Sequence, residues 1–156
     1  MQVDYIDKMG SDLTVVNAAR VSYAKTKELI DAKDEKLIKF LAEHNHWSPF
    51  GHASIQFRIK APIFVARQLV KHQVGLVWNE VSRRYVDYQP ELYEPKQWRG
   101  RPKNSKQGSD GEIELDKNEQ FRLKNTMEQC LIIYNSLIEM NVAPEQARMV
   151  LPQSMM

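Results

Sequence analysis

The chain has 156 residues, of which 42% are hydrophobic and 27% are charged. This length suits one ordinary domain, and the composition is typical of a globular protein and excludes wholesale disorder. The 22 basic and 20 acidic residues leave a net charge of +2, which argues against a general polyanion binder. We expect no membrane span and no secretory signal, because the apolar runs are short and the first residues include acids. The single cysteine allows no intrachain disulfide and fits a reducing, cytoplasmic setting.

The first 60 residues predict two strands and two helices. A short strand over residues 2–6 precedes a helix that Ser11 or Asp12 caps. A charged segment follows, and we expect Asp34 to cap the second helix. Apolar and polar residues then alternate over residues 55–60, which predicts a half-buried strand.

Polar and ionisable side chains are densest in residues 44–85. Proline suits the first turn of a helix, so a helix is expected from Pro62 to about Gln73. On that helix Arg67 and Lys71 would share one face, with Gln68 and His72 one step round. A cation, an imidazole and an amide near one helix end suit a phosphorylated ligand, and a solvated helix end is the equally favoured alternative. A further strand is expected over residues 82–88.

The rest of the chain predicts a loop followed by helices. Residues 89–117 are rich in Pro, Gly and Ser, which predicts a mobile surface loop. A long helix is expected over residues 118–140 with a broad apolar stripe, and Pro144 can open a short last helix. Cys130 lies on the stripe, where a buried, unreactive thiol is expected rather than a nucleophile.

Several common site types have no support in the sequence. There is neither an HExxH phrase nor a cysteine pair, so structural roles are favoured over zinc binding for His44, His46 and His52. No phosphate loop of the GxxxxGK[ST] type and no GxGxxG phrase occurs. Residues 96–106 hold five cations and no acid, which could contact a polyanion. A solvated loop, balanced in charge by the acids of residues 110–116, is the favoured interpretation.

One run, KHQVGLVWNEVSRRY over residues 71–85, resembles the flavin-dependent thymidylate synthases. Their phrase usually reads RHRxxSxNExSxRY, with a spacer of seven or eight residues between the triplet and its serine. The positions that match are His72, Asn79, Glu80, Ser82, Arg84 and Tyr85. The phrases NAARVS, HNHWSPFGH, APIFVARQ and APEQARMVLP also resemble the family, in the family's order along nearly the whole chain.

The departures from the family phrase concern charge. Lys71 replaces the first arginine of the triplet and keeps the positive charge, but it lacks the planar guanidinium group. Gln73 replaces the second arginine and carries no charge. Relatives continue beyond LPQ with segments that contribute to flavin and nucleotide binding. We therefore expect this 156-residue chain to bind FAD poorly and to turn over slowly. The alternative to an enzyme is a truncated, catalytically impaired remnant that still binds dUMP or assembles.

The resemblance implies a fold, a reaction and an assembly. It implies one α+β domain, with a small, mostly antiparallel sheet packed with helices that include a long C-terminal helix. The reaction is reductive methylation of dUMP to dTMP, with methylenetetrahydrofolate as carbon donor and FAD, reduced by NADPH, as hydride source. No enzymic cysteine is needed for it. The family forms a homotetramer with active sites at subunit interfaces, and neither a membrane nor nucleic acid is an expected partner.

The resemblance also implies residue roles. Catalytic roles fall to Ser82, Arg84 and Arg148. Contacts to dUMP are expected from Gln68, Glu80, Ser82, Arg83, Arg84 and Arg148, with Arg83 acting through its backbone. Contacts to FAD are expected from Ser22, His46, Ser48, Lys71, His72, Gln73, Val74 and Asn79. No metal is expected.

Overall fold

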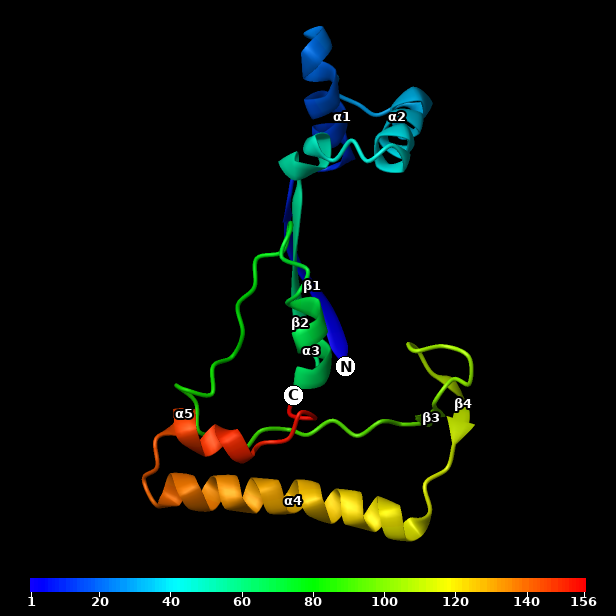
Figure 1. Ribbon diagram of the computed structural model, residues 1–156. Helices are drawn as coiled ribbons and strands as arrows, with labels where there is room; N and C mark the ends of the chain where they lie inside the picture. The colour runs from blue at the N-terminus through cyan, green and yellow to red at the C-terminus, as the bar shows by residue number, and fades with distance from the viewer. The chain divides into compact units, whose positions relative to one another are not determined.

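The computed structural model describes residues 1–156 and divides them into two compact units, Met1–Lys60 and Ala61–Met156 (Figure 1). We call these the N-terminal and C-terminal units. The chain holds five α-helices and two two-stranded antiparallel sheets, which confirms the predicted α+β class. None of the helices combines the length and apolarity that crossing a bilayer requires.

A two-stranded ribbon forms one part of the N-terminal unit. Strand β1 (Gln2–Met9) pairs antiparallel with β2 (Ser54–Lys60), and the register places Val3 opposite Ile59 and Tyr5 opposite Phe57. Residues opposite one another share a face, so one face of the ribbon is apolar. The strand predicted over residues 55–60 is present, but its expected half-burial is wrong. Every residue of β2 is exposed, because a two-stranded sheet has no second layer of its own.

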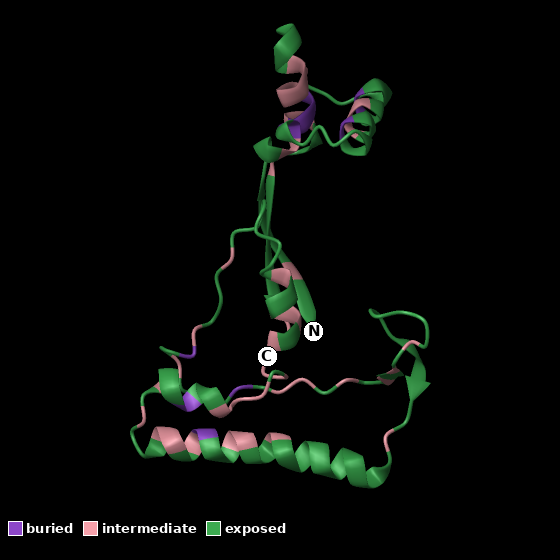
Figure 2. Cartoon of the chain, viewed as in Figure 1, coloured by how far each residue is buried: buried purple, intermediate pink, exposed green.

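Two helices form the rest of the N-terminal unit. Helix α1 (Asp12–Arg20) begins after Ser11 as predicted, and the Ser11 N–H donates to Thr14 Oγ1 at 3.0 Å. It packs against α2 (Ala32–Glu43). The buried apolar residues of this unit include Val15 and Val16 on α1 and Leu41 on α2, and Figure 2 shows buried positions on both helices. This small core sets the spacing of the two helices.

The cap of α2 differs from the prediction. Asp31, not Asp34, is the N-cap, and its carboxylate accepts from the N–H of Lys33 at 2.8 Å and of Asp34 at 3.1 Å. Asp34 lies in the first turn and accepts from the Asp31 N–H at 3.1 Å. The two aspartates thus form a reciprocal capping box. Either carboxylate can cap a helix, and only the tertiary contacts of Asp34 decide which of them does so.

The C-terminal unit begins with a helix shorter than predicted. Helix α3 (Ile63–Leu69) follows Pro62 as expected, but it ends before Lys71. The strand predicted over residues 82–88 is absent. The Ser82 carbonyl instead accepts from the N–H groups of Tyr85 at 3.0 Å and Val86 at 3.3 Å. These bonds close a turn and occupy backbone groups that a strand ladder would need.

A long helix supports the C-terminal unit. Helix α4 (Lys117–Glu139) confirms the predicted long helix and packs against α5 (Pro144–Ala147) and the 3₁₀ turn η3 (Arg148–Val150). The half-buried and buried residues of α4 lie on its side toward α5 (Figure 2). Among them Tyr134 is fully buried, and its hydroxyl donates to the Asp87 carbonyl at 3.4 Å. This bond attaches the segment after the family phrase to the helix.

The segment predicted as a loop over residues 89–117 contains a hairpin. Strands β3 (Trp98–Gly100) and β4 (Asp110–Ile113) pair antiparallel within this segment, and its mobility stays a prediction. Glycine is required at Gly100, because a Cβ there would lie 2.6 Å from the Asp110 carbonyl oxygen. No ion pair joins the cations of residues 96–106 to the acids that follow.

Candidate functional site

A cavity of about 380 Å³ lies in the N-terminal unit between the ends of its helices. Three of the predicted flavin positions, Ser22, His46 and Ser48, line it together. They come from distant parts of the sequence, so the tertiary structure brings them to one place. The whole lining comprises Ala18, Ala19, Ser22, Leu41, Asn45, His46, Trp47, Ser48 and Pro49.

Local structure explains how these side chains reach the cavity. Ser22 lies in the 3₁₀ turn η1 (Val21–Tyr23), directly after α1. At the end of α2, Asn45 adopts a left-handed φ of 56°, and the His46 N–H donates to the Leu41 carbonyl at 2.8 Å. This reversal turns the chain back towards the helix. Ser48 then opens the 3₁₀ turn η2 (Ser48–His52), which packs against α1.

The chemistry of the cavity suits a ligand that carries hydroxyl or phosphate groups. Two serine hydroxyls, the Asn45 amide and the His46 imidazole supply donors and acceptors, and no acidic side chain is among the lining residues. Ala18 and Ala19 leave room for close approach to α1. These residues fit the ribityl and phosphate parts of a flavin dinucleotide, which are hydroxylated and anionic.

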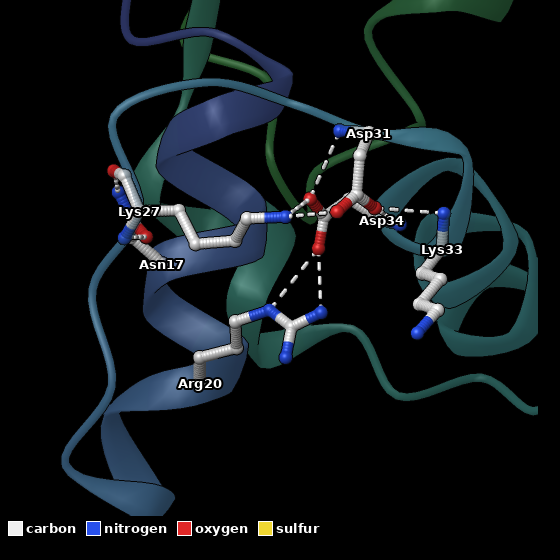
Figure 3. A network of polar contacts seen from close by, with 6 residues as sticks. All are labelled: Asn17, Arg20, Lys27, Asp31, Lys33 and Asp34. Carbon is white, nitrogen blue, oxygen red and sulfur yellow. Dashed lines mark hydrogen bonds and ion pairs between the residues drawn. The ribbon is translucent and has the colours of Figure 1, made fainter.

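A buried carboxylate is bonded to Arg20, the residue that follows the cavity residue Ala19 in the sequence. Asp34 is fully buried, and its Oδ1 accepts from Arg20 Nε at 3.1 Å and Arg20 Nη2 at 2.5 Å (Figure 3). Its Oδ2 forms an ion pair with Lys27, whose ammonium also lies 2.6 Å from Asp31 Oδ2. Asn17 completes the network, because its side chain accepts from the Lys27 N–H at 2.8 Å and donates to the Lys27 carbonyl at 3.0 Å.

Electrostatics keeps this network charged. The hydrogen bond from Lys27 lowers the pKa of the Asp34 carboxyl well below its usual range, burial opposes the shift, and the bond from Arg20 adds to it. Lys27 likewise lowers the pKa of Asp31, and both aspartates raise the pKa of Lys27. The sequence prediction missed this cluster. The two aspartates three residues apart were its only visible signal, and they indicate a capping box rather than a buried ion pair.

In the C-terminal unit the predicted flavin positions are not gathered into one cavity. Lys71, Gln73, Val74 and Asn79 are all exposed in the segment after α3. The shared helix faces predicted for Arg67 with Lys71 and for Gln68 with His72 are absent, because α3 ends at Leu69. One of those contacts survives in another form, since His72 Nδ1 lies 3.2 Å from the Gln68 carbonyl oxygen.

The predicted dUMP residues centre on the turn after Ser82. Arg83 is buried, donates to the Tyr88 carbonyl and stacks on the Tyr88 ring. The next residue, Arg84, is exposed, and its Nη2 donates to the Tyr85 hydroxyl at 2.8 Å. The Arg84 N–H also lies 3.3 Å from Ser82 Oγ. The Arg83 guanidinium is therefore held within the fold. The Arg84 guanidinium is exposed beside the Tyr85 hydroxyl, where a ligand can reach it.

The remaining predicted residues are separate from this turn. Gln68 and Glu80 are exposed, and Arg148 in η3 is exposed with its Nε donating to the Glu145 carbonyl at 3.2 Å. Cys130 is half-buried on α4, rather than fully buried as predicted. No group of three His, Cys, Asp or Glu side chains is placed to hold a metal ion.

A second cavity, of about 440 Å³, lies between α4 and the segment before the hairpin. None of the predicted site residues lines it, and three glutamates do, with one lysine. Its lining residues are Gln89, Pro90, Glu91, Leu92, Glu94, Lys124, Met127, Glu128 and Leu131. An anionic ligand would meet mostly like charge there, so the first cavity is the better candidate for a nucleotide cofactor.

Sequence comparison shows a family match along almost the whole chain. Residues 4–156 match the family model described as thymidylate synthase complementing protein. A flavin-dependent thymidylate synthase of Thermus thermophilus is 42% identical over 150 residues, which are 96% of this chain and 54% of that protein. The corresponding protein of Kosmotoga olearia is 45% identical over 152 residues, 96% of this chain and 65% of that protein. The chain thus spans between about half and two thirds of these curated relatives.

Solved structures show the same architecture. A UMP/dUMP methylase, PolB from Streptomyces cacaoi, bound with 5-Br UMP, matches with a TM-score of 0.81 and 32% identity, over 99% of this chain and 67% of that chain. Its structure bound with 5-Br dUMP matches with a TM-score of 0.82 and 34% identity, over 98% of this chain and 68% of that chain.

Proposed function

The chain belongs to the thymidylate synthase complementing protein family, and from this premise we propose that it acts in the reductive methylation of dUMP to dTMP. The observation that carries the proposal is the turn at Ser82 within the family phrase, where the Ser82 hydroxyl lies 3.3 Å from the Arg84 N–H and the exposed Arg84 guanidinium donates to the Tyr85 hydroxyl. Support also comes from relatives named flavin-dependent thymidylate synthases and from the methylase structures that hold brominated UMP and dUMP.

We propose that the exposed cations bind the nucleotide. The planar guanidinium of Arg84 suits a phosphate or an anionic pyrimidine, and Ser82 adds a hydroxyl that lies 3.3 Å from the Arg84 backbone N–H. Arg148 presents a second exposed guanidinium group. Gln68 and Glu80, which are also exposed, would select the uracil by hydrogen bonding. Arg83 has its side chain engaged with Tyr88, so its contribution would come from its backbone N–H. Ser82, Arg84 and Arg148 are the proposed catalytic residues.

We propose that the cavity of Ser22, His46 and Ser48 holds part of FAD. When bound, FAD reduced by NADPH would supply the hydride, and methylenetetrahydrofolate would supply the carbon. The remaining proposed contacts come from Lys71, His72, Gln73, Val74 and Asn79, which are all exposed. These residues would bind and orient the reactants. Holding two reactants in the right geometry by itself lowers the activation free energy of their reaction.

The proposed reaction uses no thiol of this chain. Cys130 lines neither described cavity and lies half-buried on α4. A cysteine nucleophile needs exposure and a lowered pKa. Polarisation of the uracil by the guanidinium groups would take the place of covalent activation.

We further propose that the protein works as a homotetramer with shared active sites. The apolar face of the β1–β2 ribbon supports this, since Val3 and Tyr5 are 63% and 55% exposed and Phe57 and Ile59 are 47% and 45% exposed. A two-stranded ribbon is marginal without a covering layer, and contiguous exposed apolar patches of this kind mark interfaces. Light scattering after size exclusion measures the mass, and a monomer at micromolar concentration would contradict the assembly.

The test of the proposed function is a pair of titrations. Calorimetry with dUMP and with deoxyuridine should show binding of the phosphorylated form at least tenfold tighter. Arg84→Gln should remove that preference. Arg122→Gln should keep it, because Arg122 is an exposed arginine of α4 paired with Glu119 and removed from the family phrase. Equal affinity for dUMP and deoxyuridine would contradict the phosphate role of Arg84.

Turnover is measured as dTMP formed from dUMP with FAD, NADPH and methylenetetrahydrofolate. A yellow, FAD-loaded protein that makes dTMP supports the enzyme. Binding of dUMP without flavin and without dTMP would instead support the alternative, a remnant that binds the nucleotide and does not act on it.

A further inference from the structure

The turn that carries Ser22 is not held by a hydrophobic core. None of the three residues of η1 is buried, and Val21 and Tyr23 are 70% and 75% exposed. Ser22 nevertheless lines the cavity together with His46 and Ser48. A short 3₁₀ turn with exposed side chains has little intrinsic stability, so other contacts must fix its position.

Polar contacts fix the chain on both sides of this turn. Arg20, the last residue of α1, immediately precedes η1 and donates two hydrogen bonds to Asp34. Beyond the turn, Lys27 forms an ion pair with Asp34 and is held at its backbone by Asn17 (Figure 3). The segment from Val21 to Lys27 is thus tied at each end to the same carboxylate.

The same helix supplies the opposite wall of the cavity. Asp34 lies in the first turn of α2, Leu41 lies two turns further along, and His46 follows the end of the helix. The Arg20–Asp34 contact therefore connects the wall that carries Ser22 to the wall that carries His46. Loss of this contact would remove a direct link between the two walls.

We infer that Asp34 is a positioning residue, which holds η1 through Arg20 and Lys27 so that the Ser22 hydroxyl faces the cavity. The ligand of that cavity rests on the proposed function, whereas the hold on η1 does not. Both carboxylate oxygens are fully used, because Oδ1 accepts from Arg20 and Oδ2 accepts from Lys27 and from the Asp31 N–H. In Asp34→Asn the side chain keeps its shape, but its amide NH₂ group is itself a donor. That group would face Arg20, Lys27 or the Asp31 N–H, which are donors too.

The first test needs no ligand. Backbone hydrogen exchange of residues 21–31 is measured in the wild type, in Asp34→Asn and in the more exposed Arg20→Gln, under conditions where all three are folded. Both variants should exchange about tenfold faster or more in this segment, with α4 unchanged. Lys39→Gln is the matched control, because Lys39 and Glu43 form an exposed pair on the same helix at 3.8 Å. Unchanged exchange in both variants would overturn the inference.

The second test asks whether Asp34 acts through Ser22. FAD titrations are made on Ser22→Ala, Asp34→Asn and the double variant. We expect each single change to weaken FAD binding about tenfold and the double change to weaken it little further, since a displaced hydroxyl is already lost. If the loss of FAD affinity in the double variant equals the product of the two single losses, Asp34 has only a general structural role. That result would overturn the positioning role. A wild type that binds no FAD contradicts the proposed function alone, because the exchange data still decide the role of Asp34.

Discussion

The guanidinium carbon of Arg83 lies 4.5 Å from the ring centroid of Tyr88, and the same guanidinium donates to the Tyr88 carbonyl. Arg83 keeps only 6% of its surface exposed, whereas the adjacent Arg84 is exposed. Stacking together with a main-chain bond fixes the first arginine within the fold. The two neighbours in the family phrase therefore have different tasks.

We expect Arg83→Lys to destabilise the protein, because an ammonium loses the planar stacking on Tyr88 and the fixed direction of the bond. The free energy of unfolding should fall by about 1–2 kcal/mol. Arg84→Lys should change stability by less than about 0.5 kcal/mol and weaken dUMP binding about tenfold or more. Urea denaturation and calorimetry measure the two effects, and a stability loss in Arg84→Lys alone would reverse the assignment.

Gln73→Arg should strengthen FAD binding. Gln73 is exposed in the segment after α3, so the longer side chain meets no packing restraint, and the new cation can pair with the flavin diphosphate. One charge-assisted bond contributes on the order of 1.5–3 kcal/mol, or roughly tenfold to a hundredfold in affinity. Flavin fluorescence titration gives the dissociation constant. Gln120→Arg on α4 adds the same charge elsewhere, and an equal gain in that control would point to a general charge effect.

The pH dependence of stability should reflect the Asp34 network. The lowered pKa values of Asp34 and Asp31 give stability that is present above the ordinary value of 3.8 and is lost as the pH falls through the lowered values. The raised pKa of Lys27 gives stability that is present below 10.5 and is lost as the pH rises through the raised value.

The melting temperatures of the wild type and Asp34→Asn should therefore differ by a constant amount between about pH 5 and pH 9. The difference should shrink below pH 4, and calorimetric melting curves across the range measure it. A difference that instead titrates near pH 6.5 would assign the effect to a histidine.

Cys130→Ala should retain dTMP formation. The thiol is half-buried on α4 and lines neither cavity, so its removal costs packing alone, about 0.5–1.5 kcal/mol of stability. The rate of dTMP formation is compared at a temperature where both proteins are folded. A folded variant with bound flavin and no turnover would require a thiol in the reaction.

Some features follow from the sequence alone, because they depend on neighbouring residues. Ser11, Pro62 and Pro144 mark helix starts by the geometry of a helix end, and the long apolar stripe of residues 118–140 predicts α4. The family also follows from short phrases in a fixed order along the chain, including residues 71–85, before any fold is known.

Other features depend on contacts between residues far apart in the sequence, and only the tertiary structure decided them. The pattern of residues 82–88 suits a strand, but the bonds from Tyr85 and Val86 to Ser82 make a turn. Asp34 resembles any first-turn acid until Arg20 and Lys27 converge on it. A single sequence specifies which residues can donate, accept or pack, whereas the energy of a buried ion pair or of a cavity wall depends on which distant groups meet there.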